Sequence, residues 1–144
     1  GLIGGAAAFV GIAANTGDSS GGGTVSSSGS ESVTPSAQCD VQQASGGGSL
    51  FDQRTIEMGQ SEGSFIFEYE TRRVADEIII KQDGEVICGT DGCESTGGEP
   101  GAWEVRQKTC PLSGNSTSIL VEVNANCDPS QTGTNLWYYT VYCP

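Results

Sequence analysis

The chain has 144 residues, with 18 acidic against 6 basic side chains, a formal net charge of −12 and no histidine. The absence of histidine excludes Ser-His-Asp and Cys-His nucleophile pairs and histidine-ligated zinc sites. The excess of carboxylates argues against nucleic acid as a partner, because phosphate contacts need lysine and arginine. Only 35% of the residues are apolar, which is little for an enzyme-scale core. Composition therefore favours an extracellular structural or interaction protein without enzymatic activity.

Two regions of different composition divide the chain. Residues 1–49 contain 12 glycines, 10 serines, 7 alanines, one aromatic residue and no lysine or arginine. Such a segment cannot bury enough apolar surface to offset the entropy that it loses on ordering. Residues 50–144 hold nine of the ten aromatic residues and all six basic ones, and can form a small core. We therefore predict an apolar arm over residues 1–14, a Gly/Ser-rich linker over residues 15–49 and a folded domain over residues 50–144.

The arm has the sequence LIGGAAAFVGIAA over residues 2–14. A membrane-spanning helix needs about 20 apolar residues, so we expect no stable membrane span here. The sequence does not decide whether the arm is a helix or a strand. Small residues recur at the spacing of tightly packed helices, while a strand here would be apolar on both faces, as in a strand buried on both sides. In either conformation the large side chains need an apolar partner surface. We expect neighbouring copies to supply it, rather than the chain's own domain. These side chains are Leu2, Ile3, Phe9, Val10 and Ile12.

Alternating apolar and polar residues recur through the domain between turn signals. Asp83-Gly84 is a strong hairpin signal between two of these segments, and no segment has a convincing helical period. About seven strands at this spacing are typical of an antiparallel β-sandwich or jelly roll, so we predict an all-β domain stapled by disulfides. The expected strands are residues 54–58, 63–70, 76–82, 85–88, 103–108, 117–124 and 135–143.

The last expected strand has aromatic residues on both faces. Trp137 and Tyr139 share one face, and Tyr138 and Tyr142 share the other. If the first pair is buried, the second pair packs under a loop or the arm, forms a subunit interface, or offers a platform on which sugars stack. Tyrosine suits the last two roles because it combines apolar area with a polar tip.

Six cysteines, an even number, predict three disulfides formed in an oxidising compartment, which places the protein outside the cell or on its surface. No CxxC motif occurs, which argues against a zinc ribbon or a thioredoxin-like motif. Sequence proximity favours Cys88–Cys93, Cys127–Cys143 and Cys39–Cys110, with Cys93–Cys110 as the main rival.

Acidic side chains near the predicted turns are candidate Ca²⁺ ligands, since Ca²⁺ binds carboxylate and carbonyl oxygens. No DxDxDG loop supports them, and a solvated acidic surface is the simpler interpretation, so we predict no metal or other cofactor. The candidate ligands are Asp76, Glu77, Asp83, Asp91 and Glu94.

Three further features carry weaker signals. Glu68 and Glu70 lie on one strand face like a glycosidase pair, but such spacing is common in acidic β proteins. Asn115 begins an Asn-Ser-Thr sequon and is a candidate glycosylation site, with an ordinary turn as the alternative. Arg72-Arg73, the only basic pair, is expected in a solvated loop rather than against an acidic patch of a neighbouring subunit.

Five short motifs occur along the C-terminal region: G-x-F-x-F-x-Y-x-T, D-x-I-x-I, a DG turn, Gly-Cys and G-T-x-x-W-x-x-x-V-x-C-P. They lie at residues 63–71, 76–80, 83–84, 92–93 and 133–144. With these motifs the region resembles a module found in secreted and surface proteins of bacteria. The resemblance implies an extracellular β-sandwich used in adhesion or assembly, without established catalytic residues. Cys88, Cys110 and the arm lie outside the pattern, and the arm loosely resembles the apolar assembly segments of pilus and filament subunits.

These features lead us to expect the structural subunit of an extracellular filament or pilus-like polymer. The arm would insert into neighbouring subunits, the linker would give reach, and the domain would face outward. The alternative is a secreted adhesion module that binds carbohydrate or Ca²⁺, with the exposed tyrosines as its site. The expected assembly interface consists of Leu2, Ile3, Phe9, Val10, Ile12, Tyr138 and Tyr142.

Overall fold

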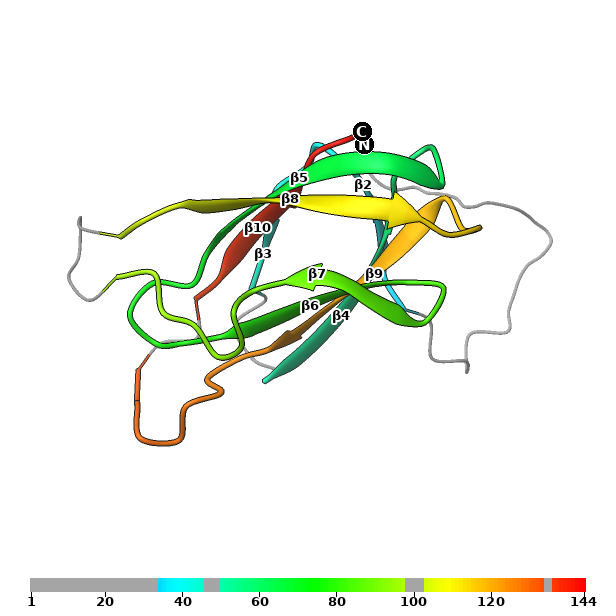
Figure 1. Ribbon diagram of the computed structural model, residues 1–144. Coiled ribbons are helices and arrows are strands. Elements are labelled where there is room, and N and C mark those ends of the chain that lie inside the picture. Colours follow the sequence, from blue (N-terminus) through cyan, green and yellow to red (C-terminus); the bar gives the residue numbers. More distant parts are fainter. Residues whose placement is uncertain (1–33, 46–49, 98–102, 134–135) are drawn as a thin grey trace, which may run out of the picture. The chain divides into compact units, whose positions relative to one another are not determined.

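Two β-sheets pack face to face around one apolar core (Figure 1). The structure, a computed structural model, describes residues 34–45, 50–97, 103–133 and 136–144, all of which belong to one unit, Thr34–Pro144. The arm, with its expected interface residues Leu2, Ile3, Phe9, Val10 and Ile12, lies outside the described residues. Among the described residues we find nine strands and no helix. The predicted all-β, disulfide-stapled sandwich is therefore confirmed.

The four-stranded sheet has the order β3-β10-β5-β8, and the five-stranded sheet has the order β2-β4-β9-β6-β7. Every pairing is antiparallel except that of β2 with β4, which is parallel. The strands are β2 (Ser36–Gln38), β3 (Gln43–Ala44), β4 (Phe51–Glu57), β5 (Glu62–Glu70), β6 (Glu77–Gln82), β7 (Glu85–Gly89), β8 (Arg106–Ser113), β9 (Ser118–Asn124) and β10 (Tyr138–Val141).

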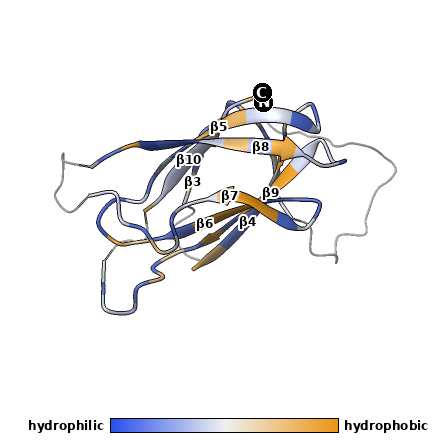
Figure 2. Ribbon diagram, in the orientation of Figure 1, coloured by the Kyte–Doolittle hydropathy of each residue, from blue (hydrophilic) through white to orange (hydrophobic). Residues whose placement is uncertain are grey.

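The core follows from strict two-residue alternation in the central strands. In β5 the buried residues are Phe65, Phe67 and Tyr69, and β9 and β6 supply isoleucines and valines from the opposite sheet. Trp137 and Tyr139 lie between the sheets with their rings 5.7 Å apart. Figure 2 shows that the apolar residues follow the strands of both sheets, while the loops are mostly hydrophilic.

Gln82, at the end of β6, connects two separate turns through its side-chain amide. Its Nε2 donates to the carbonyl oxygens of Ser61 (2.9 Å) and Ser116 (3.0 Å). Its Oε1 accepts hydrogen bonds from the backbone N–H groups of Ser113 (3.0 Å) and Gly114 (3.1 Å). All four hydrogen-bonding positions of this buried amide are therefore used, which fixes the β4–β5 and β8–β9 turns against β6.

Several expected strand boundaries differ from the observed ones, including the start of β4 at Phe51 rather than at residue 54. β8 begins at Arg106 rather than at residue 103, and its buried residues are Cys110 and Leu112. β10 covers only Tyr138–Val141 of the expected residues 135–143. β2 and β3 lie in the expected linker, so the folded unit begins earlier than residue 50. These two strands are short and polar, and their pairing with β4 and β10 determines their conformation.

The expected disulfide pairing is wrong for every pair, although all six cysteines are bridged. The observed disulfides are Cys39–Cys143, Cys88–Cys110 and Cys93–Cys127. The Cys88–Cys110 bridge joins the edge strands β7 and β8, which belong to different sheets. The Cys39–Cys143 bridge also joins the two sheets, from the end of the edge strand β2 to the end of the inner strand β10. Sequence proximity was misleading because the stacking of the two sheets, not the chain separation, brings these α-carbons within 5.0 and 5.6 Å.

Candidate functional site

The outer surface of the four-stranded sheet carries rings and carboxylates side by side. The antiparallel register places Tyr138 of β10 opposite Glu70 of β5, and Thr140 opposite Glu68. Tyr142 continues this row, with its backbone N–H donating to the carbonyl of Ile66 at 2.9 Å. Because alternate residues of a strand point to one side, Tyr138 and Tyr142 share the face opposite to the buried Tyr139. The structure thus brings the two predicted tyrosines together with the Glu68 and Glu70 pair.

Tyr142 is held in place through its hydroxyl group. The side chain is 36% exposed, and its hydroxyl donates to Glu68 Oε1 at 2.7 Å. This hydrogen bond raises the pKa of Tyr142, because loss of the proton would place two negative charges side by side. Gln107 Nε2 also donates to Glu68 Oε1, at 3.2 Å. Glu68 therefore fixes the ring of Tyr142 and the amide of its β8 neighbour.

Tyr138 belongs to a cation–π cluster that sequence reasoning missed. The Arg72 guanidinium lies 4.7 Å from the Tyr138 ring centroid and 4.0 Å from that of Trp103. Arg72 Nε also forms a 2.6 Å ion pair with Glu70. Such contacts are worth about 0.5–2 kcal/mol each, depending on desolvation. Arg72 is thus not a solvated loop residue, and it holds both rings and a carboxylate in fixed positions.

We call Glu68, Glu70, Arg72, Trp103, Tyr138 and Tyr142 together the aromatic–acidic face. The hollow beside it has a volume of about 30 Å³ and is lined by residues including Gln42, Val105 and Thr140. A space of this size admits about one water molecule. A ligand of this face would therefore lie on its surface and stack on the rings, rather than enter a cleft.

A second charged cluster lies at the edge of the same sheet and uses its carboxylates internally. Glu94 accepts hydrogen bonds from the Tyr69 hydroxyl (2.9 and 3.0 Å), from the Asp91 N–H (2.9 Å) and from Arg106. Burial alone would raise the pKa of Glu94, but these hydrogen bonds outweigh it and lower the pKa. Asp91 forms a 2.6 Å ion pair with Lys108, which lowers its pKa. Neither carboxylate is available as a strong cation ligand.

The remaining candidate Ca²⁺ ligands are likewise dispersed. Asp83 accepts the N–H groups of Asn115 (2.7 Å) and Ser116 (3.2 Å), and Glu77 accepts the Asn124 amide at 3.1 Å. Within the described ranges, no group of three or more Cys, Asp or Glu side chains is arranged to hold a metal ion. The geometry gives the acidic turns a structural role, as caps of neighbouring backbone N–H groups.

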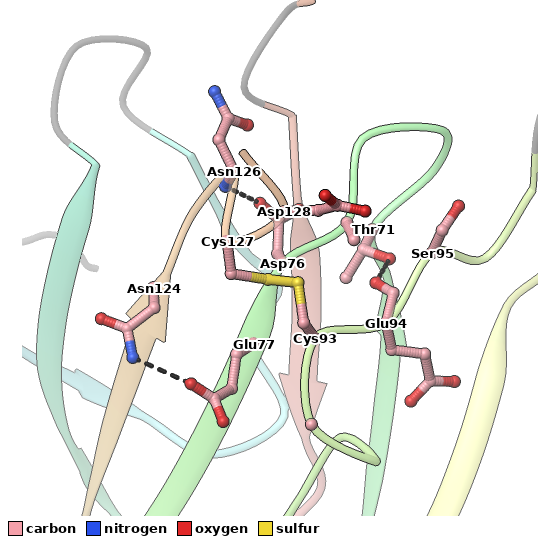
Figure 3. Close-up of a disulfide and its surroundings, with 12 residues drawn as sticks. Thr71, Asp76, Glu77, Cys93, Glu94, Ser95, Asn124, Asn126, Cys127 and Asp128 are labelled. Carbon is pink, nitrogen blue, oxygen red and sulfur yellow. Dashed lines mark hydrogen bonds between the residues drawn. A yellow bond between two sulfur atoms is a disulfide. The ribbon is translucent and has the colours of Figure 1, made fainter. Parts of the chain in front are cut away.

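Asp76 is the exception among these acids, because its side chain is completely buried. Oδ1 accepts the Asn126 N–H at 2.9 Å, as Figure 3 shows, while Oδ2 has no hydrogen-bond partner. Burial raises the pKa of Asp76 to about 7, and the hydrogen bond from Asn126 offsets only part of this shift. The DEIII sequence that Asp76 begins gave no sign of this environment, which the loop around Asn126 creates.

The other predicted surface residues have simple surroundings. Asn115 is exposed in the turn between β8 and β9. Arg73 donates to the carbonyl oxygen of Thr132 at 2.9 Å and pairs with no acidic patch of the described domain. The described residues contain no helix long and apolar enough to cross a membrane.

The sequence matches no known protein-family model, and no curated protein is significantly similar to it.

Proposed function

We propose that the chain is the structural subunit of an extracellular, pilus-like filament. In this arrangement the arm is buried against neighbouring subunits, the linker gives reach, and the domain faces outward. The three disulfides are compatible with an oxidising extracellular environment. The strongly acidic composition leaves no surplus of cations for nucleic acid.

The observation that carries this proposal is that the domain closes its core from its own residues. The core cluster runs from Cys39 to Val141 and includes members of both sheets. Two disulfides tie the sheets together: Cys88–Cys110 joins the edge strands β7 and β8, and Cys39–Cys143 joins the ends of β2 and β10. A hollow of about 250 Å³ among the described residues mixes charged and hydroxyl side chains, such as Lys81, Asp83 and Ser116, with the apolar Ile119 and Leu120.

The arm therefore needs a partner outside this core. Burying a large apolar side chain contributes roughly 1.5–3 kcal/mol, and the arm carries Leu2, Ile3, Phe9, Val10 and Ile12. Together these side chains supply the main favourable contribution to association between copies, which opposes the loss of translational freedom and the ordering of the arm.

Deletion of residues 1–14 tests this proposal. The truncated chain is expected to sediment as a folded monomer, whereas the full chain assembles. A matched control removes the same length of linker, residues 17–30, and keeps the arm, so it should still assemble. Assembly of the chain without residues 1–14 to the same extent as the full chain would contradict the proposal.

The second candidate function is an adhesion module that binds a neutral glycan. The aromatic–acidic face favours it, because its rings and carboxylates are already fixed by hydrogen bonds and ion pairs. Aromatic rings stack on the C–H faces of sugars, and carboxylates accept hydrogen bonds from sugar hydroxyl groups. The negative charge of this face disfavours sulfated or sialylated ligands. Glycan-array binding by the monomer, lost in Tyr142→Ala and retained in the matched surface variant Val86→Ala, would support it. Absence of binding by the wild type would exclude it.

A further inference from the structure

The buried carboxyl group of Asp76 lies at the junction of two loops that a disulfide joins. Asp76 immediately precedes β6, and its backbone exchanges two hydrogen bonds with Glu94, each 3.1 Å long. Its Oδ1 accepts the N–H of Asn126, which has a positive φ of 51°. Cys93 and Cys127, the neighbours of Glu94 and Asn126, form a disulfide (Figure 3). One carboxyl group thus contacts both linked loops.

The surroundings of Asp76 do not supply a compensating charge. The Glu94 carboxylate is turned to Tyr69 and Arg106, and that of Glu77 to Asn124. The carboxylate of Asp128 accepts hydrogen bonds from Ser130.

The two arginines that precede Asp76 are also engaged elsewhere. Arg72 pairs with Glu70 and the rings of the aromatic–acidic face, and Arg73 donates to Thr132. No basic side chain of the described residues forms an ion pair with Asp76. An ionised carboxylate in such a site is strongly unfavourable, because it is neither solvated nor paired.

We propose that protonation of the Asp76 side chain keeps the two disulfide-linked loops at this end of the domain closed. We call this protonation switch the lock. The neutral acid can stay buried beneath the closed loops. Burial of the carboxylate costs more than the hydrogen bond from Asn126 returns, so ionisation loosens the two disulfide-linked loops while the sheets stay folded. Burial raises the pKa of this carboxyl to about 7, so the lock would work near neutral pH. Because the folded-state pKa lies above the unfolded-state value, the stabilisation is fully present in acid. It is lost as the pH rises toward the folded-state pKa.

Amide hydrogen exchange, corrected for the intrinsic pH dependence of the rate, tests the lock on the full chain. Between pH 5.5 and 8.5 we expect the protection of the Glu94 and Asn126 amides to fall at least tenfold in the wild type. In Asp76→Asn, a neutral isostere, the protection should not change with pH. Glu77→Gln is the matched control, because it removes the neighbouring carboxylate and should keep the wild-type pH dependence.

The lock is refuted if wild-type protection does not depend on pH, or if Asp76→Asn shows the same dependence as the wild type. Should Asp76→Asn fail to fold, the ¹³C shift of the Asp76 carboxyl carbon in the wild type decides. A titration midpoint between pH 6 and pH 8 supports the lock, and a midpoint outside that range contradicts it.

Discussion

Replacing Gln82 with leucine removes a side-chain amide whose four hydrogen bonds hold two turns against β6. Leucine has a similar volume, so the packing of the buried stem is kept and the hydrogen bonds are the main loss. Each such bond contributes about 1 kcal/mol net, so we expect Gln82→Leu to lower the free energy of unfolding by about 4 kcal/mol. That is a large part of the roughly 5–15 kcal/mol typical of a domain, and corresponds to a drop in Tm of roughly 15 °C.

Two further variants separate the hydrogen bonds from general effects of substitution. Gln82→Glu keeps the two accepted bonds but turns a buried carboxylate oxygen toward the carbonyl oxygens of Ser61 and Ser116, so it should cost at least as much as Gln82→Leu. Gln53→Leu is the control, because Gln53 donates one partly exposed bond, to Glu122 at 3.1 Å. Urea denaturation with the disulfides intact measures all three. A cost for Gln82→Leu no larger than that for Gln53→Leu would refute the role assigned to this amide.

Three other predictions concern the cation–π contacts of Arg72, the disulfide bonds and the pH dependence of stability. Arg72→Lys keeps the charge but loses planar stacking on two rings, and should cost about 1–2 kcal/mol in urea denaturation; no loss would contradict the cation–π contacts. The Cys39–Cys143 bridge spans 104 residues and the Cys88–Cys110 bridge spans 22, so removing the first should lower the free energy of unfolding by roughly 1 kcal/mol more than removing the second. Calorimetry that shows the reverse order would contradict this loop-entropy reasoning. Between pH 4 and pH 8, the free energy of unfolding of the wild type should fall by up to about 4 kcal/mol because of Asp76, and Asp76→Asn should lack this fall. Parallel pH profiles of the unfolding free energy in the two proteins would contradict this.

The strands that alternation marks clearly were predicted well from the sequence. β5 and β9 each present every second residue to the core, so their inward faces follow directly from the order of apolar residues. β2 and β3 were missed because they have three and two residues and no apolar pattern of their own. Their strand conformation depends on hydrogen bonds to β4 and β10, which no local signal encodes.

The candidate site was predictable only in part, for a related reason. The same alternation that buries Tyr139 places Tyr138 and Tyr142 on the opposite face, as expected from the sequence. The stacking of Arg72 on Trp103 joins two loop residues 31 positions apart, and depends on how the chain returns from β7 to β8. Local patterns therefore identified the two tyrosines, but not Trp103 or the arginine that joins it to Tyr138.

The disulfide pairing also could not be predicted from local sequence patterns. Cys88 and Cys93 are close in sequence, but the β7 edge directs Cys88 to β8 of the other sheet, and Cys93 lies beside the loop that follows β9. Pairing is set by which strand ends meet when the sheets stack, so it requires the topology before it can be inferred.

Electron micrographs of the full chain as isolated from its source test the assembly of subunits most directly. If the arm joins copies of the chain, the images will contain filaments, and these will be absent from matched images of the chain without residues 1–14. Single, unassembled particles from the full chain, at concentrations where its five large apolar arm residues should drive association, would contradict the proposed role of the arm.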